Sequence, residues 1–309
     1  MWLIFAAVIA VMFILDLWVF NRKSHEIRFR EALTWTLVWV GLAFAFNAGV
    51  WYFLGQAKAL EFLTGYVIEE SLSVDNLFVF IMIFSYFRVS RAHQPKILKW
   101  GIIGALVMRG IFIVLGIGLI ERFHWMIYLF GGILIYTGFK MAFGAEEEVH
   151  PDKNLLVMLA RKMFPFTKRV RGDWFFTRRK GLLVASPLFL ALVMVESSDV
   201  LFALDSIPAI FAVTLDPFIV FTSNIFAIMG MRALYFLLAS VMGMFVYLKF
   251  GISSILAFVG GKMIATAVGV HIPIHISLLV IFSCLALAIA ASLLVGRKRA
   301  GQTVLTNHA

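Results

Sequence analysis

The chain has 309 residues, of which 62% are hydrophobic and only 14% are charged. Soluble domains carry about 25% charged residues, so this composition excludes a soluble domain and predicts an integral membrane protein. The net charge of +10 does not indicate nucleic-acid binding, because the basic residues stand in short segments beside apolar runs, where they set membrane orientation and attract anionic lipids.

The apolar runs, taken in chain order, predict an all-α polytopic membrane protein with about nine transmembrane helices. The predicted spans are residues 1–20, 32–54, 62–87, 97–120, 125–144, 181–214, 216–240, 250–269 and 272–296. The first run lacks the basic start of a signal peptide and is interrupted by Asp16, so we expect it to be retained. The chain thus divides into helices at 1–144, a loop at 145–180, helices at 181–296 and a tail at 297–309.

The distribution of Lys and Arg predicts the orientation, because short loops rich in these residues stay in the cytoplasm. Of the 27 basic residues, 21 lie in alternate connections, and the intervening loops carry only Lys58 and Arg122. We therefore expect a bacterial inner-membrane protein with its N-terminus outside and its C-terminus in the cytoplasm. The basic connections are 21–31, 88–99, 145–180, Lys249 and Arg297–Arg299.

The 145–180 loop mixes nine basic residues with leucine, methionine and phenylalanine. This mixture is typical of a helix that lies on the inner membrane surface. A basic linker without such a helix explains the composition as well.

Two polar stretches inside the spans read alike and indicate an internal repeat. Residues 69–80 read E-E-S-L-S-V-D-N-L-F-V-F, and residues 199–211 read D-V-L-F-A-L-D-S-I-P-A-I-F. With Asp75 set against Asp205, each copy has a carboxylate, five residues, a second carboxylate and a neutral oxygen ligand. Matches of L-V-M-R-G-I-F with M-G-M-R-A-L-Y, and of G-F-K-M with G-G-K-M, follow in the same order. Spans 3–5 and 6–8 are therefore predicted to form an inverted three-helix repeat, an architecture of secondary transporters.

Seven of the 17 acidic residues fall inside predicted spans, together with four basic residues. A charge at the bilayer centre costs roughly 2.5–3.5 kcal/mol, so such residues indicate either pairing or function. Pairing with the four bases leaves about three carboxylates to hold protons or a cation. The acidic residues are Asp16, Glu69, Glu70, Asp75, Glu196, Asp199 and Asp205, and the bases are Arg109, Lys140, Arg232 and Lys262.

Helical geometry divides these carboxylates between two faces. On an ideal helix, Glu69 shares a face with Ser73 and Asn76, whereas Asp75 lies about 120° away. The second copy repeats this arrangement, so both carboxylates of one copy meet one ion only if the backbone unwinds or the site spans several helices. Pro208 predicts such a break, because its missing N–H frees the carbonyl of Leu204.

The residue types predict a site for a hard divalent cation. Carboxylate, amide and hydroxyl oxygens suit Mg²⁺, Ca²⁺ and Mn²⁺ better than Zn²⁺ or Cu⁺, although ligand type does not choose among the first three. No organic cofactor is expected, and the single Cys284 gives no thiolate-lined site. The predicted ligands are Glu69, Asp75, Asn76, Glu196, Asp199, Asp205 and Ser206, with Glu70, Ser73, Ser198 and Leu204 as secondary candidates.

The four intramembrane bases, with Asp16, are predicted to be charge partners. Arg109 and Lys262 fall near the middle of their spans and are expected to face carboxylates, whereas Lys140 and Arg232 lie toward the cytoplasmic ends and could reach the interface. We favour ion pairs that keep the empty site from repelling itself.

The polar motifs inside the spans resemble those of the TerC family of integral membrane proteins, most closely its Alx branch. The resemblance covers residues from about 12 to 295 and implies export of Mn²⁺ from a bacterial cytoplasm. The motifs are T-G-Y-V-I-E-E-S-L-S-V-D-N-L-F-V-F at 64–80, V-E-S-S-D-V-L-F-A-L-D-S-I-P-A-I-F-A-V-T at 195–214 and D-P-F-I-V-F-T-S-N-I-F-A-I-M-G-M-R-A-L-Y-F at 216–236. The family pattern carries over onto Glu69, Ser71, Asp75, Asn76, Glu196, Ser198, Asp199, Asp205, Ser206 and Pro208, with Glu70 at a variable position.

We therefore expect a transporter, and not an enzyme, that exports Mn²⁺ as its substrate, with protons as a candidate counter-ion. One alternative is an anion path or oxyanion (tellurite) resistance built on the four bases, although the predicted core is net acidic. Another is an accessory subunit for inserting or folding exported proteins, which would tolerate loss of the buried carboxylates. The oligomeric state is not indicated by the sequence. Asp216, in an outer loop, is expected to tolerate substitution by asparagine.

Overall fold

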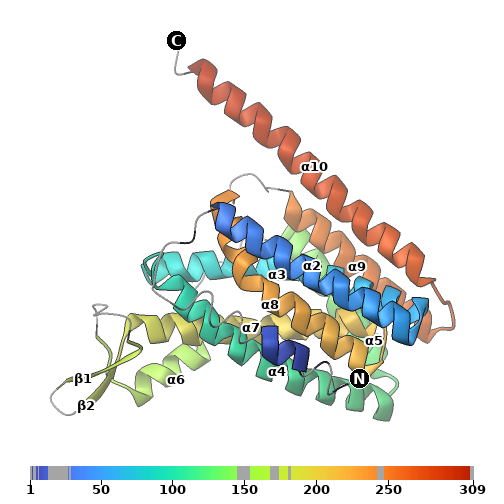
Figure 1. Cartoon of the computed structure of the whole chain (residues 1–309), viewed down its shortest axis with the longest axis horizontal. Helices are drawn as coiled ribbons and strands as arrows, with labels where there is room; N and C mark the ends of the chain where they lie inside the picture. The colour runs from blue at the N-terminus through green and yellow to red at the C-terminus, as the bar shows by residue number, and fades with distance from the viewer. Residues whose placement is uncertain are drawn as a thin grey trace.

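The computed structural model of the protein describes residues 29–144, 154–167, 174–179, 182–241 and 247–306, together with 2, 5, 7–12 and 27. It is a helical bundle with a small β-hairpin at one end (Figure 1). The labelled elements are α2 (Phe29–Leu54), α3 (Gln56–Tyr86), α4 (Gln94–Arg122), α5 (Met126–Phe143), α6 (Leu155–Met163), β1 (Phe176–Arg179), β2 (Leu182–Ala185), α7 (Pro187–Phe211), α8 (Pro217–Val241), α9 (Leu248–Ala267) and α10 (Ile274–Thr306).

Seven helices among the described residues are long and apolar enough to cross a membrane, namely α2, α4, α5 and α7–α10. Helix α3 is longer than most of them, with 31 residues, but its acidic residues keep it outside this compositional class. The fold is therefore the predicted helical membrane protein. The predicted number of nine spans is not established, because most of the 1–20 run and Asp16 lie outside the described residues.

The helices pack in cross-pairs between the two halves of the chain. Helix α3 packs against α8, α4 packs against α7, and α5 packs against α9. In the predicted repeat, α3 corresponds to α7, α4 to α8 and α5 to α9. A two-fold relation between the halves would produce these pairs, so the packing is consistent with the inverted repeat, which itself stays a prediction.

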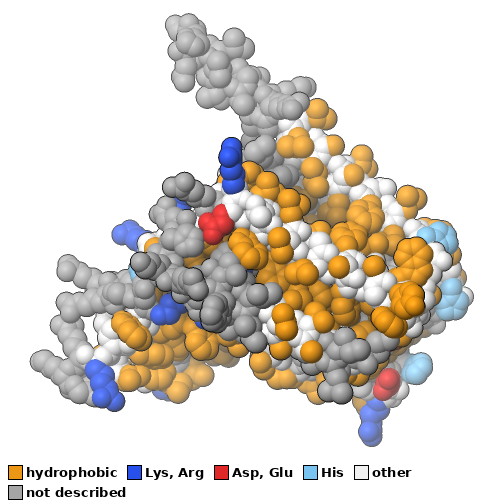
Figure 2. All heavy atoms as spheres, viewed as in Figure 1, with side chains coloured by type: hydrophobic (Ala, Val, Ile, Leu, Met, Phe, Trp, Pro, Cys, Tyr) orange, Lys and Arg blue, Asp and Glu red, His pale blue; other side chains and the backbone are white. Residues whose placement is uncertain are grey.

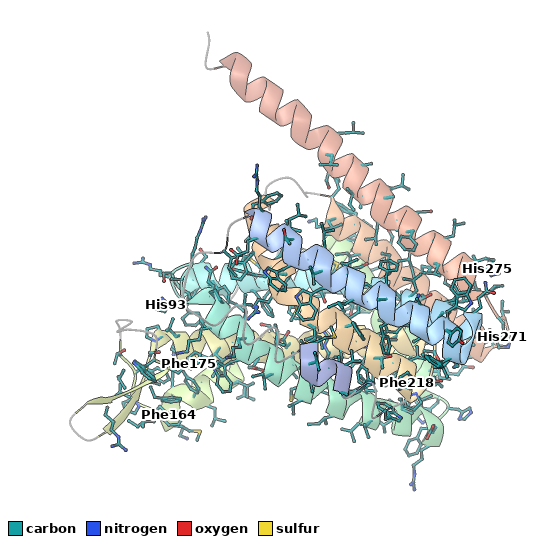
Figure 3. All side chains as sticks on the ribbon, viewed as in Figure 1. His93, Phe164, Phe175, Phe218, His271 and His275 are labelled. Atoms are coloured by element: carbon teal, nitrogen blue, oxygen red, sulfur yellow. The ribbon has the colours of Figure 1, made fainter. Side chains whose placement is uncertain are left out.

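The two ends of the bundle carry different chemistry. Figure 3 shows His93, Phe164 and Phe175 at one end and His271 and His275 at the opposite end. The basic 88–99 and 145–180 connections therefore share one end, as alternating spans require. Figure 2 shows hydrophobic side chains over most of the visible face of the bundle, with charged side chains toward its ends. We refer to the end near His271 as the outer end, following the positive-inside prediction.

Within 145–180, the described part contains the expected amphipathic helix and an unexpected hairpin. Asn154 caps α6 by accepting a hydrogen bond from the Val157 backbone N–H at 3.1 Å, and its amide donates to Ser197 of α7 at 2.7 Å. Strands β1 and β2 pair antiparallel. The sequence assigned residues 182–185 to a membrane span, which was wrong, because α7 begins only at Pro187. This part of the chain therefore contains two strands in addition to the predicted helices.

A second correction concerns the acidic helices. Helix α7 runs without interruption from Pro187 to Phe211 and includes Pro208, and α3 is likewise continuous through Asp75. The expected unwinding at Pro208 is therefore wrong for this structure. Because successive residues of a continuous helix turn by about 100°, the two carboxylates of each copy face different neighbours.

Candidate functional site

The centre of the polar interior is a network that joins α3, α4 and α8. The guanidinium of Arg109 forms an ion pair with Glu69 and donates a hydrogen bond to the Asn224 side-chain oxygen at 2.8 Å. All three side chains are buried, with exposed fractions of 3%, 1% and 0%. Burying an unpaired charge is very costly, so Arg109 and Glu69 compensate each other at this depth.

Asp199 brings a second carboxylate from α7 to this network. It is 3% exposed and interacts electrostatically with both Arg109 and Glu69. Glu196, one turn earlier, interacts electrostatically with Asp199, and its carboxylate lies against the backbone of α4 at Gly104. A Cβ atom at Gly104 would collide with this carboxylate, so glycine is required for the close approach. Glu69 and Asp199 thus share the buried base Arg109, and Glu196 interacts with this group through Asp199.

Several oxygen atoms of this interior have no hydrogen-bond partner among the described residues. Both carboxylate oxygens of Asp199, Oε2 of Glu69 and the hydroxyls of Ser73 and Ser206 are in this class. Buried polar atoms are nearly always paired, so a group of unpaired ones in two packed helices indicates a place for a ligand or water. The stripe predicted on each helix is therefore buried and turned inward. Asn76, on the same stripe of α3, is also buried.

Asp205 does not join this group. It accepts a hydrogen bond from the Thr137 hydroxyl of α5 at 2.9 Å and interacts electrostatically with Lys140. The sequence placed it in one site with Asp199, but on a continuous helix the two face different neighbours. Asp75 is half-buried on α3. Among the described residues, no three His, Cys, Asp or Glu side chains are close enough to hold one metal ion.

Of the secondary candidates, Ser73 belongs to the group, whereas the other three lie at its edges or outside it. Glu70 packs against α8, where its Oε1 lies 3.4 Å from the position of a Cβ at Gly230. The Ser198 hydroxyl donates to the Met194 carbonyl of its own helix at 2.9 Å. Leu204 is 49% exposed, so its side chain is outside the buried polar group.

The remaining bases occupy different depths. Arg232 is buried and Lys140 is exposed near the end of α5, as expected of a residue that reaches the interface. Lys262 is buried, but it lies toward the outer end of α9 and interacts electrostatically with Glu61. Lys262 therefore interacts with a carboxylate, as expected, although this carboxylate belongs to a residue outside the predicted spans, and Lys262 stands five residues before the end of α9 at Ala267.

Sequence reasoning missed three functional candidates. Asn224 is neutral, so a count of charged residues could not find it, although it stands in the quoted 216–236 motif. Glu61 was placed before its span, whereas α3 begins at Gln56. Asp216 was expected to be an indifferent loop residue, but its carboxylate accepts hydrogen bonds from the α8 backbone and from Lys58.

Comparison with known proteins identifies the family of this chain and several close relatives. Residues 54–300 match the family described as "Integral membrane protein TerC family". The chain is 51% identical to membrane protein STKORF319 of Myxococcus xanthus, over 96% of this chain and 93% of that protein. It is 48% identical to the candidate membrane-bound redox modulator Alx of Escherichia coli K12, over 92% and 91% of the two chains. No solved structure matches.

Proposed function

The chain belongs to the TerC family of integral membrane proteins, and from this premise we propose that it is a secondary transporter that exports a divalent metal ion, Mn²⁺ above others, from the cytoplasm. The observation that carries the proposal is the buried pair Glu69 and Asp199. These carboxylates present three oxygens that lack a hydrogen-bond partner among the described residues. A cation is the ligand that such oxygens bind best.

The oxygen ligand atoms of this site favour a hard cation that binds with moderate affinity. Glu69, Asp199, Ser73 and Ser206 offer only oxygen, the ligand atom preferred by Mn²⁺, Mg²⁺ and Ca²⁺. Since no three acidic or histidine side chains of the described residues converge, the ion would complete its shell with water and neutral oxygens. A site with two carboxylates binds less tightly than a full cage, which suits a transporter that must release its cargo.

Arg109 gives this site a resident cation. When no metal is bound, its guanidinium neutralises Glu69, which limits repulsion between Glu69 and Asp199. A metal ion that binds Glu69 would repel the guanidinium, and Asn224 offers an alternative acceptor for it at 2.8 Å. The arginine can thus leave Glu69 without losing every buried partner.

Protons are proposed as the counter-ion. Glu69 and Asp199 are two carboxylates beside Arg109, and Glu196 interacts electrostatically with Asp199, so binding of a divalent cation competes with protons for the same oxygens. An inward proton gradient could then drive outward metal movement as the two halves alternate in exposing the site.

The test is transport by purified protein in liposomes. Asp199→Asn preserves the shape of the side chain and removes its charge, so Mn²⁺ flux should fall to the level of empty liposomes. Glu121→Gln is the matched control, because Glu121 is exposed at the end of α4 and lies outside the site. Unchanged Mn²⁺ flux in Asp199→Asn would contradict the proposed site. Collapse of the pH gradient at zero voltage tests the counter-ion, because proton-driven uphill flux must then stop.

Two rival functions are distinguished by the same variants. An oxyanion path would need an available base, but Arg109 is already shared by Glu69 and Asn224, and tellurite flux would not require Asp199. An accessory role in protein insertion would survive Asp199→Asn. The Alx relatives are described as redox modulators. In this chain, such a role would have to proceed without an intrachain disulfide, because Cys284 is the single cysteine.

A further inference from the structure

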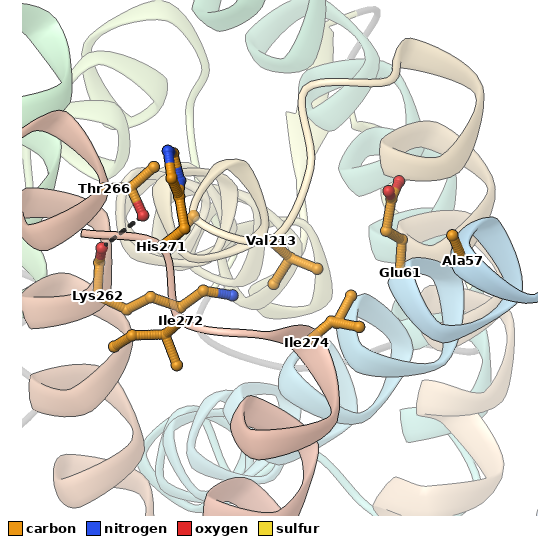
Figure 4. Close-up of a pocket in the computed structure, with 9 residues that line it drawn as sticks. Ala57, Glu61, Val213, Lys262, Thr266, His271, Ile272 and Ile274 are labelled. Carbon is orange, nitrogen blue, oxygen red and sulfur yellow. Dashed lines mark hydrogen bonds between the residues drawn. The ribbon is translucent and has the colours of Figure 1, made fainter. Parts of the chain in front are cut away.

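A cavity with both charged and apolar walls lies apart from the Glu69 group, at the outer end of the bundle. It has a volume of about 220 Å³ and is formed by the ends of α3, α7 and α9 and by the turn before α10. Glu61 and His271 lie on opposite walls, and Lys262 extends between them (Figure 4). We call this cavity the outer pocket.

The outer pocket lies at the ends of the two helices that carry the buried carboxylates. Glu61 precedes Glu69 by eight residues on α3, which corresponds to roughly 12 Å along a helix axis. Val213, just beyond the end of α7, lines the pocket, and the same helix carries Asp199. The two helices that supply the buried carboxylates therefore lead directly to the pocket.

Two ammonium groups are arranged around the one carboxylate that lines this pocket. Lys58 contacts Glu61 at 2.9 Å and also contacts Asp216 at 2.9 Å. Lys262, which is only 7% exposed, reaches from α9 and interacts electrostatically with Glu61. These four residues have no net charge when all are ionised. A metal ion that binds Glu61 must therefore compete with cations that are covalently tethered to the pocket.

We propose that the outer pocket is a second, low-affinity binding site for the divalent cation, with Glu61 as its carboxylate ligand and Lys262 as the tethered cation that expels the ion. This inference rests on the proposed export function and adds an exit site to it. The repulsion between an ammonium and a divalent ion in a partly buried pocket weakens binding and speeds release.

A small anion is the competing occupant, since two lysines are present. Lys58 is already shared by two carboxylates, so an anion would have to bind Lys262 in competition with Glu61. In the cysteine-labelling experiment described next, slower labelling of the pocket with inorganic phosphate, and not with a metal ion, would overturn the assignment.

The experiment measures access to the pocket directly, without relying on transport. Ile272→Cys is introduced in a Cys284→Ser background, so that an impermeant maleimide labels only the pocket lining. Labelling of right-side-out vesicles should be slowed by external Mn²⁺, and Glu61→Gln should abolish this protection. Lys262→Gln should lower the half-protecting Mn²⁺ concentration by about tenfold or more, because one unit charge is removed at short range. Lys262→Arg, which keeps the charge, should resemble the parent.

The controls separate this inference from the proposed function. Ala57→Cys, on another wall of the pocket, replaces Ile272→Cys if that variant does not fold. Protection that does not depend on Glu61, weaker protection in Lys262→Gln, or labelling only in inverted vesicles would overturn the exit site. If protection depends on Glu61 but liposomes show no Mn²⁺ flux, the proposed export function is wrong and the proposed cation site in the outer pocket is supported. If flux is normal and protection is absent, the pocket is wrong and export stands.

Discussion

Replacing Arg109 by glutamine should strongly destabilise the protein, because the change leaves Glu69 buried without its ion-pair partner. The guanidinium and the carboxylate are 3% and 1% exposed, so water cannot take over the lost contact. Removing one partner of such a buried pair costs about 3–5 kcal/mol. For a chain of this size, this loss corresponds to a decrease of roughly 6–20 °C in the melting temperature, given about 2–4 °C per kcal/mol.

The assay is thermal unfolding of purified protein in detergent at one fixed heating rate, and tryptophan fluorescence is the readout. Arg122→Gln is the matched control, because Arg122 is exposed at the end of the same helix. We expect this control to lie within about 0.5 kcal/mol of the parent. The double variant Glu69→Gln with Arg109→Gln removes both charges and should recover most of the lost stability.

The reasoning would be refuted by additivity. If the Arg109 and Glu69 substitutions each lower the melting temperature and their effects simply add, the two side chains do not interact in the folded protein. A melting temperature of Arg109→Gln equal to that of Arg122→Gln would refute it more directly.

Three further outcomes are expected. Thr137→Val should destabilise the protein by about 1–3 kcal/mol, because Asp205 loses its 2.9 Å hydrogen bond; an unchanged unfolding temperature would show that water replaces the hydroxyl. The pKa of the Asp216 carboxyl lies below its ordinary value of 3.8, since burial raises the pKa but Lys58 and two backbone amides lower it more. Its stabilising ion pair is therefore complete above about pH 4 and is lost as the pH falls below that value. Asp216→Asn, which keeps the helix cap, should be less stable than the parent at pH 6, and this difference should shrink as the pH falls through the lowered pKa of Asp216; a difference that is the same at every pH would contradict this account. A polarity-sensitive fluorophore at Met158→Cys, on the exposed face of α6, should shift to the blue in vesicles rich in anionic lipid, and the same spectrum in neutral and anionic vesicles would show that α6 does not lie on an anionic membrane surface.

Most of the fold could be predicted from hydrophobic runs, because each membrane-spanning helix is one long, continuous apolar segment of the sequence. The predicted span 125–144 became α5 at Met126–Phe143, and 216–240 became α8 at Pro217–Val241. The hairpin at 176–185 was missed, since strands of four residues in a basic segment have no such signal. Their pairing depends on contacts between residues that are not adjacent in sequence.

The candidate site was predictable only in part. The charges of Glu69, Asp199 and Arg109 marked them as unusual in a membrane, and the structure brings these three together. Asn224 has no charge, so its contact with Arg109 follows only from the packing of α4 against α8. Pro208 was misread because a proline removes one hydrogen bond but need not end a helix whose neighbours hold it in place.

The separation of Asp199 from Asp205 has a consequence for movement. The two residues stand six positions apart on one continuous helix, roughly 9 Å along its axis, and they contact different partners. Asp199 faces Glu69 and Arg109, whereas Asp205 is hydrogen-bonded to Thr137 of α5. Because α7 is unbroken between them, a shift or rotation that opens the Asp199 group must also strain the contact with α5. If the Asp199 group is the cation site proposed above, Asp205 couples the position of α5 to the state of that site without being one of its ligands.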